Sequence, residues 1–145
     1  MRADQARKSS KSFFLAFQRC MPRRLLPGGN FESSLVPAVV CAALSIEIGF
    51  KAIVLKARRE VSEHALAPLF IAMPADEQNS IVKRVGLDLA VFNARLSSVS
   101  NSFAGWRYIY ETNYAEIDIH FITNLAHATQ HALINSGRAS GMLSA

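Results

Sequence analysis

Residues 33–59 read SSLVPAVVCAALSIEIGFKAIVLKARR, and this stretch decides the fold. It predicts one long helix that begins near Ser33–Ser34, has Pro37 in its first turn and continues to about Arg59. The middle of the stretch is apolar on nearly every side, as in helices that are buried on several sides. We therefore expect this helix to form the core around which the other helices pack.

Two charges, Glu47 and Lys51, interrupt the apolar stretch. They lie four residues apart with the glutamate first, which is the favourable order for an ion pair on a helix. An exposed pair of this kind would be ordinary, but charges on an otherwise apolar helix are rare unless they are paired or used. Both a structural and a functional role stay open. Because the charges break the apolar run, we also predict that no segment spans a membrane, which takes about 20 predominantly apolar residues.

The rest of the chain predicts an all-α, single-domain, up-and-down bundle of four to five helices. Further helices are expected over about residues 4–20, 62–74, 76–105 and 114–134. The helix expected over residues 76–105 has the clearest periodicity, because its apolar residues are spaced alternately three and four apart, as in bundle packing. This stripe consists of Val82, Val85, Leu89, Phe92, Leu96, Val99 and Phe103.

The 145 residues suffice for one domain. We assign residues 1–30 to a basic first helix with a Pro/Gly loop, both part of that domain, and residues 31–135 to the bundle core. Ser136-Gly137 should stop the last helix, so residues 136–145 are expected to form a loose tail. The composition is globular, with 50% hydrophobic and 19% charged residues, and this excludes an intrinsically disordered chain.

Positive charge is concentrated at the N-terminus. Residues 1–24 carry a net charge of +6, whereas the remaining chain carries −1. Such a segment attracts nucleic acid or an anionic membrane without specifying either. It is also rich in Arg and Ser, as transit peptides are, although a first helix with a solvated basic face fits the pattern better. The predicted nucleic-acid-binding residues are Arg7, Lys8, Lys11, Arg19, Arg23 and Arg24.

The cysteines and histidines give little sign of a metal site. Cys20 and Cys41 have no C-x-x-C partner, which excludes a zinc knuckle and suggests reduced thiols in a cytoplasmic protein. His127 and His131 lie four apart on the last helix and are weak metal candidates, because no H-E-x-x-H motif supplies the remaining chemistry. A polar stripe facing solvent or a dimer partner is the simpler interpretation. We expect no bound metal and no cofactor.

Two further segments combine charged and aromatic residues. WRYIYE, residues 106–111, pairs an arginine with aromatic rings, which can bind phosphate and stack bases but can also plug a core. Arg59 and His64 have the spacing of an Arg-x4-His ribonuclease signature, although the match is short and crosses a helix end. No phosphate-binding glycine loop or G-x-S-x-G nucleophile motif is present.

Three segments together resemble the HEPN family (higher eukaryote and prokaryote nucleotide-binding domains). SIEIGFKAIVL, residues 45–55, resembles the family's glutamate, lysine and apolar run. HALAPLF, residues 64–70, resembles its His-Asp-Leu-x-x-Leu-Phe helix start, with alanine in place of the acid. FAGWRYIYE, residues 103–111, resembles its Arg-Tyr-x-Tyr-Glu segment. The order and spacing agree across roughly residues 33–134. The matching positions are Glu47, Lys51, His64, Arg107, Tyr108 and Glu111.

This resemblance implies a helical bundle that often dimerises and acts on or with RNA. Many members are ribonuclease toxins or defence effectors, and others bind nucleotides or partner nucleotidyltransferases. Cleaving members carry Arg-x4–6-His near the last helix, which this sequence lacks, so catalysis by the usual residues is in doubt. We expect Glu47, Lys51, Arg107 and Glu111 to converge, either as a structural network or as the floor of an anion or nucleotide site.

The sequence therefore leaves three functions open. The first is an RNA- or nucleotide-associated protein of a bacterial stress, defence or toxin–antitoxin type, with a cognate antitoxin or nucleotidyltransferase as a further partner. The second is a non-enzymatic, homodimeric interaction module whose polar cluster is structural. The third and weakest is a metal-dependent hydrolase that uses His127 and His131.

Overall fold

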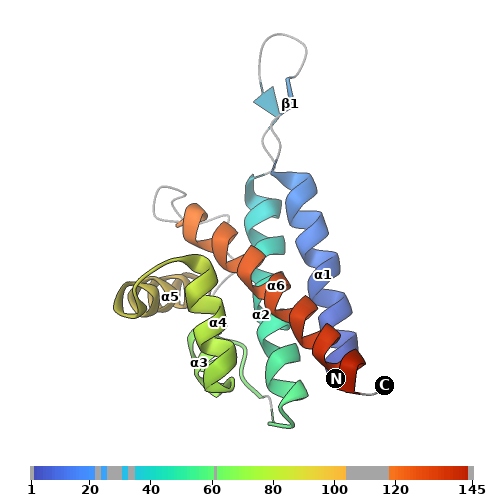
Figure 1. The fold of residues 1–145 in the computed structure, drawn as a ribbon. Coiled ribbons are helices and arrows are strands. Elements are labelled where there is room, and N and C mark those ends of the chain that lie inside the picture. Colours follow the sequence, from blue (N-terminus) through green and yellow to red (C-terminus); the bar gives the residue numbers. More distant parts are fainter. Residues whose placement is uncertain are drawn as a thin grey trace.

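A computed structural model describes residues 2–21, 24–25, 31–32, 35–60, 62–103 and 118–143. Within these ranges the protein is all-α, as predicted, and has six helices and one two-residue β-ladder (Figure 1). The helices are α1 (Ala3–Cys20), α2 (Leu35–Lys56), α3 (Leu66–Ala72), α4 (Ala75–Val85), α5 (Leu89–Phe103) and α6 (Ile119–Leu143). The ladder pairs β1 (Arg24–Leu25) with β2 (Phe31–Glu32), antiparallel, between α1 and α2.

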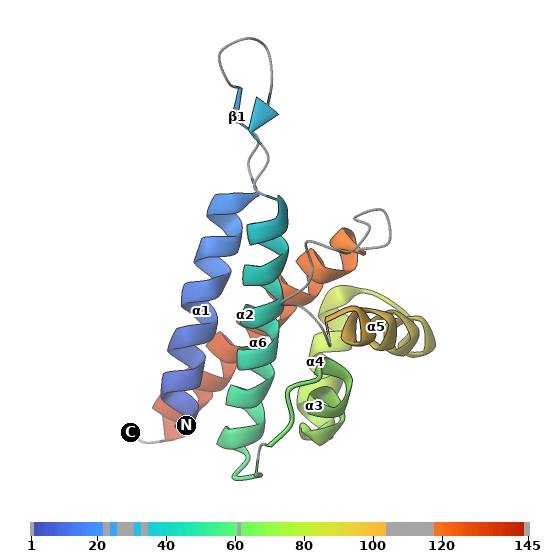
Figure 2. The same cartoon turned by 180° about the vertical axis from the view of Figure 1, so that it is seen from behind.

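Helices α1 and α2 lie side by side and run in opposite directions (Figures 1 and 2). Small residues line their contact, including the fully buried Ala6 and Ala42. At the centre, Ser10 Oγ donates to the Ser45 carbonyl (2.7 Å) and Ser45 Oγ donates to the Ser10 carbonyl (3.0 Å). This reciprocal pair satisfies both buried hydroxyls, as burial requires, and it fixes the register of the two helices.

Helix α6 crosses the α1–α2 pair at the same level. The Gln130 side chain donates through Nε2 to Ser10 Oγ (2.7 Å) and lies 3.3 Å from Ser45 Oγ. The backbones approach so closely that a Cβ atom at Gly49 would lie 2.5 Å from Thr129 Cγ2. Three helices therefore meet around one small and buried crossing, which we call the serine crossing (Ser10, Ser45, Gly49, Thr129 and Gln130).

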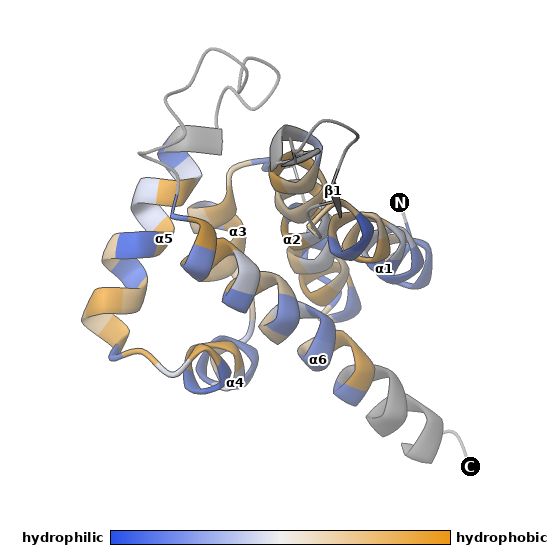
Figure 3. Ribbon diagram, turned by 90° about the horizontal axis from the view of Figure 1, so that it is seen from above, coloured by the Kyte–Doolittle hydropathy of each residue, from blue (hydrophilic) through white to orange (hydrophobic). Residues whose placement is uncertain are grey.

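Helices α3, α4 and α5 cover the other side of α2 and α6 (Figure 3). A chain of phenylalanine rings joins four helices here: the Phe50–Phe70, Phe70–Phe92 and Phe92–Phe121 centroids are 5.9, 5.0 and 5.6 Å apart. All four rings are at most 2% exposed. This aromatic core connects α2, α3, α5 and α6 into one hydrophobic interior.

The predicted fourth helix is two helices, so the expected count of four to five is wrong. Gly86 adopts a positive φ of 82° and ends α4, and α5 then begins at Leu89. Helix α5 runs across the direction of α1 and α2, so the arrangement is not a simple up-and-down bundle (Figures 1 and 3). Because of this turn, Leu89 lies away from the core and is 54% exposed. Phe92, Leu96 and Val99 are buried, as predicted.

Two other boundaries differ from the sequence prediction. Helix α6 continues to Leu143, past the expected stop at Ser136-Gly137, because a glycine inside a helix costs only about 1 kcal/mol and need not end it. Helix α2 ends at Lys56, slightly before the predicted Arg59. There Arg59 N donates to the Val54 carbonyl (3.2 Å) and Arg58 N to the Leu55 carbonyl (2.9 Å), while Arg58 takes a left-handed φ of 59°. This is the usual helix-ending turn, with arginine where glycine is commonest.

Helix α2 also bears on the membrane prediction. Residues Pro37–Lys56 are long and apolar enough to cross a membrane by length and composition, although Glu47 and Lys51 lie within them. That no segment spans a membrane therefore stays a prediction. However, 61% of this segment is buried inside the molecule. The burial against α1, α3 and α6 is that of a core helix, the role that the sequence predicted.

Candidate functional site

The structure joins three of the predicted site residues in one polar cluster, Glu47, Lys51 and His64. Lys51 Nζ lies 3.0 Å from Glu47 Oε2 and 2.8 Å from His64 Nδ1. The imidazole Nδ1 is also 3.8 Å from the same carboxylate oxygen. The Lys51 and Glu47 side chains are only 14% and 17% exposed, whereas His64 is 79% exposed. The ion pair is therefore largely covered, and the histidine forms its solvent-facing edge.

The local fold explains how these residues meet. Glu47 and Lys51 stand one turn apart on α2, and the turn after α2 reverses the chain toward α3. Before α3, Glu63 Oε1 accepts weak hydrogen bonds from the backbone N–H groups of His64 (3.3 Å) and Ala65 (3.4 Å). At the start of α3, Ser100 Oγ accepts from Ala67 N (3.1 Å). These contacts hold His64 over Lys51.

The chemistry of the cluster follows from the donor and acceptor types. A lysine ammonium can only donate, so His64 Nδ1 must accept. The neutral imidazole then carries its proton on Nε2, which is the tautomer that this contact selects. One ammonium faces one carboxylate, so the cluster is electrically balanced while His64 is neutral. The imidazole of His64 is the solvent-exposed member of the cluster.

Arg59 and His64 do not form a joint ribonuclease-like site. The Arg59 guanidinium donates to the Ala72 carbonyl at the end of α3 (2.5 Å), whereas His64 contacts Lys51 on α2. The sequence match therefore corresponds to two separate contacts that attach the α2–α3 connection to its neighbours.

Three predicted residues, Arg107, Tyr108 and Glu111, lie outside the described residues. The expected convergence of Arg107 and Glu111 with Glu47 and Lys51 therefore stays a prediction. The Glu47–Lys51 half of that network is present as an ion pair.

Sequence reasoning missed a second polar cluster, in which Arg95 of α5 meets Asp118 at the start of α6. The Arg95 guanidinium donates to both carboxylate oxygens of Asp118, through Nε (2.7 Å) and through a terminal nitrogen (2.8 Å). It also lies over the Phe121 ring, 5.3 Å from the ring centroid. Asp118 also accepts from Phe121 N (3.2 Å) as a helix cap. The Arg95 hydrogen bonds lower the pKa of Asp118, although burial opposes them.

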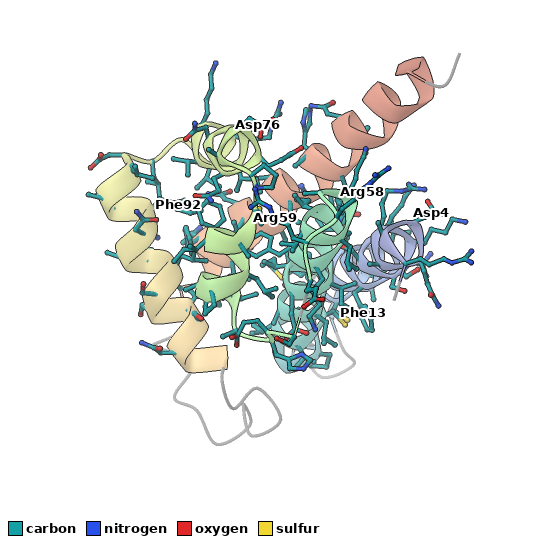
Figure 4. The ribbon with its side chains drawn as sticks, turned by 90° about the horizontal axis from the view of Figure 1, so that it is seen from below. Asp4, Phe13, Arg58, Arg59, Asp76 and Phe92 are labelled. Carbon is teal, nitrogen blue, oxygen red and sulfur yellow. The ribbon has the colours of Figure 1, made fainter. Side chains whose placement is uncertain are left out.

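The predicted basic residues are distributed along α1 and beyond. Asp4 lies on α1 (Figure 4). Arg7 and Lys8 contact it at 2.7 and 3.2 Å, and these contacts lower the pKa of Asp4. Lys11 and Arg19 are exposed farther along the helix. Arg24 lies in β1, and Arg23 lies outside the described residues.

His127 and His131, the two weak metal candidates on α6, each contact another side chain. His127 packs edge-on against Phe14 with ring centroids 4.9 Å apart, and His131 Nδ1 lies 3.1 Å from the Asn135 side-chain nitrogen. Over the part of the chain that the structure describes, no three His, Cys, Asp or Glu side chains are grouped as metal ligands. Cys20 and Cys41 are free thiols. Burial is the main cause that raises the pKa of the Cys41 thiol, and the charge of Cys20 raises it further.

Comparisons with protein-family models, with curated protein sequences and with solved structures find no match to this chain. Assignment of a function therefore depends on the residues and the geometry described above.

Proposed function

We propose that the chain is a HEPN-like, RNA- or nucleotide-associated protein of a bacterial stress, defence or toxin–antitoxin type. The meeting of Glu47, Lys51 and His64 in one cluster is the observation that supports it best. These residues come from two of the three segments that carry the resemblance, and they are separated by the end of α2. Charged side chains are rarely covered on a core helix unless they are paired or used, and this pair lies beneath an exposed histidine.

The proposed activity does not use the usual Arg-x4–6-His pair of the cleaving members. Arg59 is engaged by the α3 carbonyl, and the last helix carries no arginine at that distance before a histidine. Binding of RNA or nucleotide is therefore the core of the proposal, with any cleavage at an unusual site. A cytoplasmic homodimer that works with an antitoxin or nucleotidyltransferase belongs to the same proposal.

The test is an RNA binding and cleavage assay on the wild type, His64→Ala and Arg107→Ala, in low and high salt and with and without chelator. His120→Ala is the matched control, because His120 is an exposed histidine on α6 outside the cluster. We expect binding or cleavage that weakens in folded His64→Ala and Arg107→Ala and persists in His120→Ala. Absence of RNA and nucleotide binding by the wild type would contradict the proposal, and loss on chelation would favour a metal-dependent hydrolase.

One observation favours a non-enzymatic interaction module instead. Lys51 is matched by a covered carboxylate, so it leaves little positive potential for a phosphate. Ile71 on α3 is 73% exposed and Leu89 on α5 is 54% exposed, so both apolar side chains are available for contact with a second copy. Under this alternative, light scattering gives a dimer mass, and His64→Ala changes neither mass nor RNA binding.

A further inference from the structure

We propose that the outward face of α1 is the surface that binds the RNA phosphate backbone, an inference that rests on the proposed function. The structure separates the six basic residues that the sequence grouped together. Arg7 and Lys8 share Asp4, whereas Lys11 and Arg19 are exposed and make no ion pair with a described residue. The surface is defined by Lys8, Lys11 and Arg19, which we call the α1 cationic row.

The row follows from helix geometry. At about 100° per residue, Lys8, Lys11 and Arg19 fall within an arc of about 80°, and Lys8 and Arg19 are about 16 Å apart along the axis. The opposite side of α1 is buried, with Ala6, Ser10 and Phe17 at most 3% exposed. Asp4 is the one acidic residue of α1 and stands at its start, so the part of the row from Lys11 onward has no neighbouring acid on the helix.

RNA fits this row better than a membrane does. An amphipathic helix binds a membrane surface by inserting its apolar face. The apolar face of α1 is already packed in the bundle, and Figure 3 shows α1 lying against α2 at the edge of the molecule. Leu15, 42% exposed, is the one large apolar side chain between Lys11 and Arg19 on the outward side. A row of cations with little apolar area matches a chain of phosphates, whose binding is dominated by charge.

The test compares two variants that each remove two positive charges. Lys11→Gln/Arg19→Gln changes the row, and Lys83→Gln/Arg84→Gln changes two exposed residues in the last turn of α4. Binding of a single-stranded oligouridine is measured by fluorescence anisotropy over a salt series, and circular dichroism checks that both variants fold. We expect the row variant to bind several-fold more weakly, with a log–log salt slope shallower by about 1.4, or about 0.7 per phosphate contact. The α4 variant should match the wild type.

The outcomes separate the two proposals. If the wild type binds no RNA, this inference fails, and if it also binds no nucleotide, the proposed function fails as well. If the wild type binds RNA but the two variants weaken equally, net charge alone governs binding, so the α1 surface is wrong while the proposed function stands. Binding to vesicles rich in phosphatidylserine without binding to oligouridine would overturn the choice of RNA.

Discussion

At the scale of single residues, the Arg95–Asp118 pair shows how one contact serves two elements. Its bidentate geometry is the strong form of an arginine–carboxylate contact. The same carboxylate accepts a hydrogen bond from Phe121 N and so caps α6. Asp118 therefore both caps α6 and connects it to α5. Both side chains are about one third exposed, which limits the electrostatic gain through solvent screening.

We predict that Asp118→Asn lowers the free energy of unfolding by about 1 kcal/mol at neutral pH, because asparagine keeps the cap but loses the ion pair. The folded pKa of Asp118 is lowered, so its contribution is present above the unfolded pKa of about 3.9 and is lost as the pH falls through the folded value. Urea denaturation should therefore show a gap between wild type and variant that narrows as the pH falls below the unfolded pKa toward the lowered folded pKa. A gap that stays constant with pH would assign the effect to packing.

At the scale of helices, the serine crossing determines how closely α1, α2 and α6 approach. The buried hydroxyls and the Gln130 amide satisfy one another, and no described buried side-chain nitrogen or oxygen is left without a partner. Such a network favours one register over its neighbours, because a slipped register would strand buried polar groups. Gly49 provides the space that this approach needs.

Gly49→Ala tests the close approach. The added methyl group would lie 2.5 Å from Thr129 Cγ2 and 2.9 Å from Ser10 Oγ, so we expect a net loss of about 1–3 kcal/mol despite the better helix propensity of alanine. Thr129→Ser removes the methyl group that clashes most, and the double variant should lose less than the sum of the two single variants. Thermal and urea unfolding of all four proteins measure this coupling. Simple additivity would show that α6 does not press on Gly49.

The helices also show what the sequence can predict about this fold and site. The long α2 follows from its nearly continuous apolar stretch, and the burial of Phe92, Leu96 and Val99 follows from periodicity. The spacing of Glu47 and Lys51 indicated their ion pair. The turn at Gly86 was missed, because an apolar spacing of three and four runs through it unchanged, and φ is invisible in that spacing. His64 was singled out by the family resemblance and by its spacing after Arg59, and not by periodicity. Arg95 and Asp118 were missed, because they are 23 residues apart and no local pattern links them.

At the scale of the whole molecule, the aromatic core joins the α1–α2–α6 side to the α3–α5 side. Phe70 stands at its centre, within 5.9 Å of Phe50 and 5.0 Å of Phe92 between ring centroids. Helix α3 is only 7 residues long, too short to be stable by itself, so its stability comes from this packing. We therefore expect the described helices to unfold as one cooperative unit.

Phe70→Ala should lower the free energy of unfolding by about 3–5 kcal/mol, because it empties a buried aromatic site that is 2% exposed. If that variant does not fold, Phe70→Leu should show a smaller loss of the same sign. Leu89→Ala is the control, and we expect a change of at most about 0.5 kcal/mol, since Leu89 is exposed although the apolar stripe placed it inside. Urea denaturation gives the energies, and hydrogen exchange compares α2 with α5. If α5 exchanged far faster than α2 in the wild type, its unfolding would be local and the two sides would not form one cooperative unit.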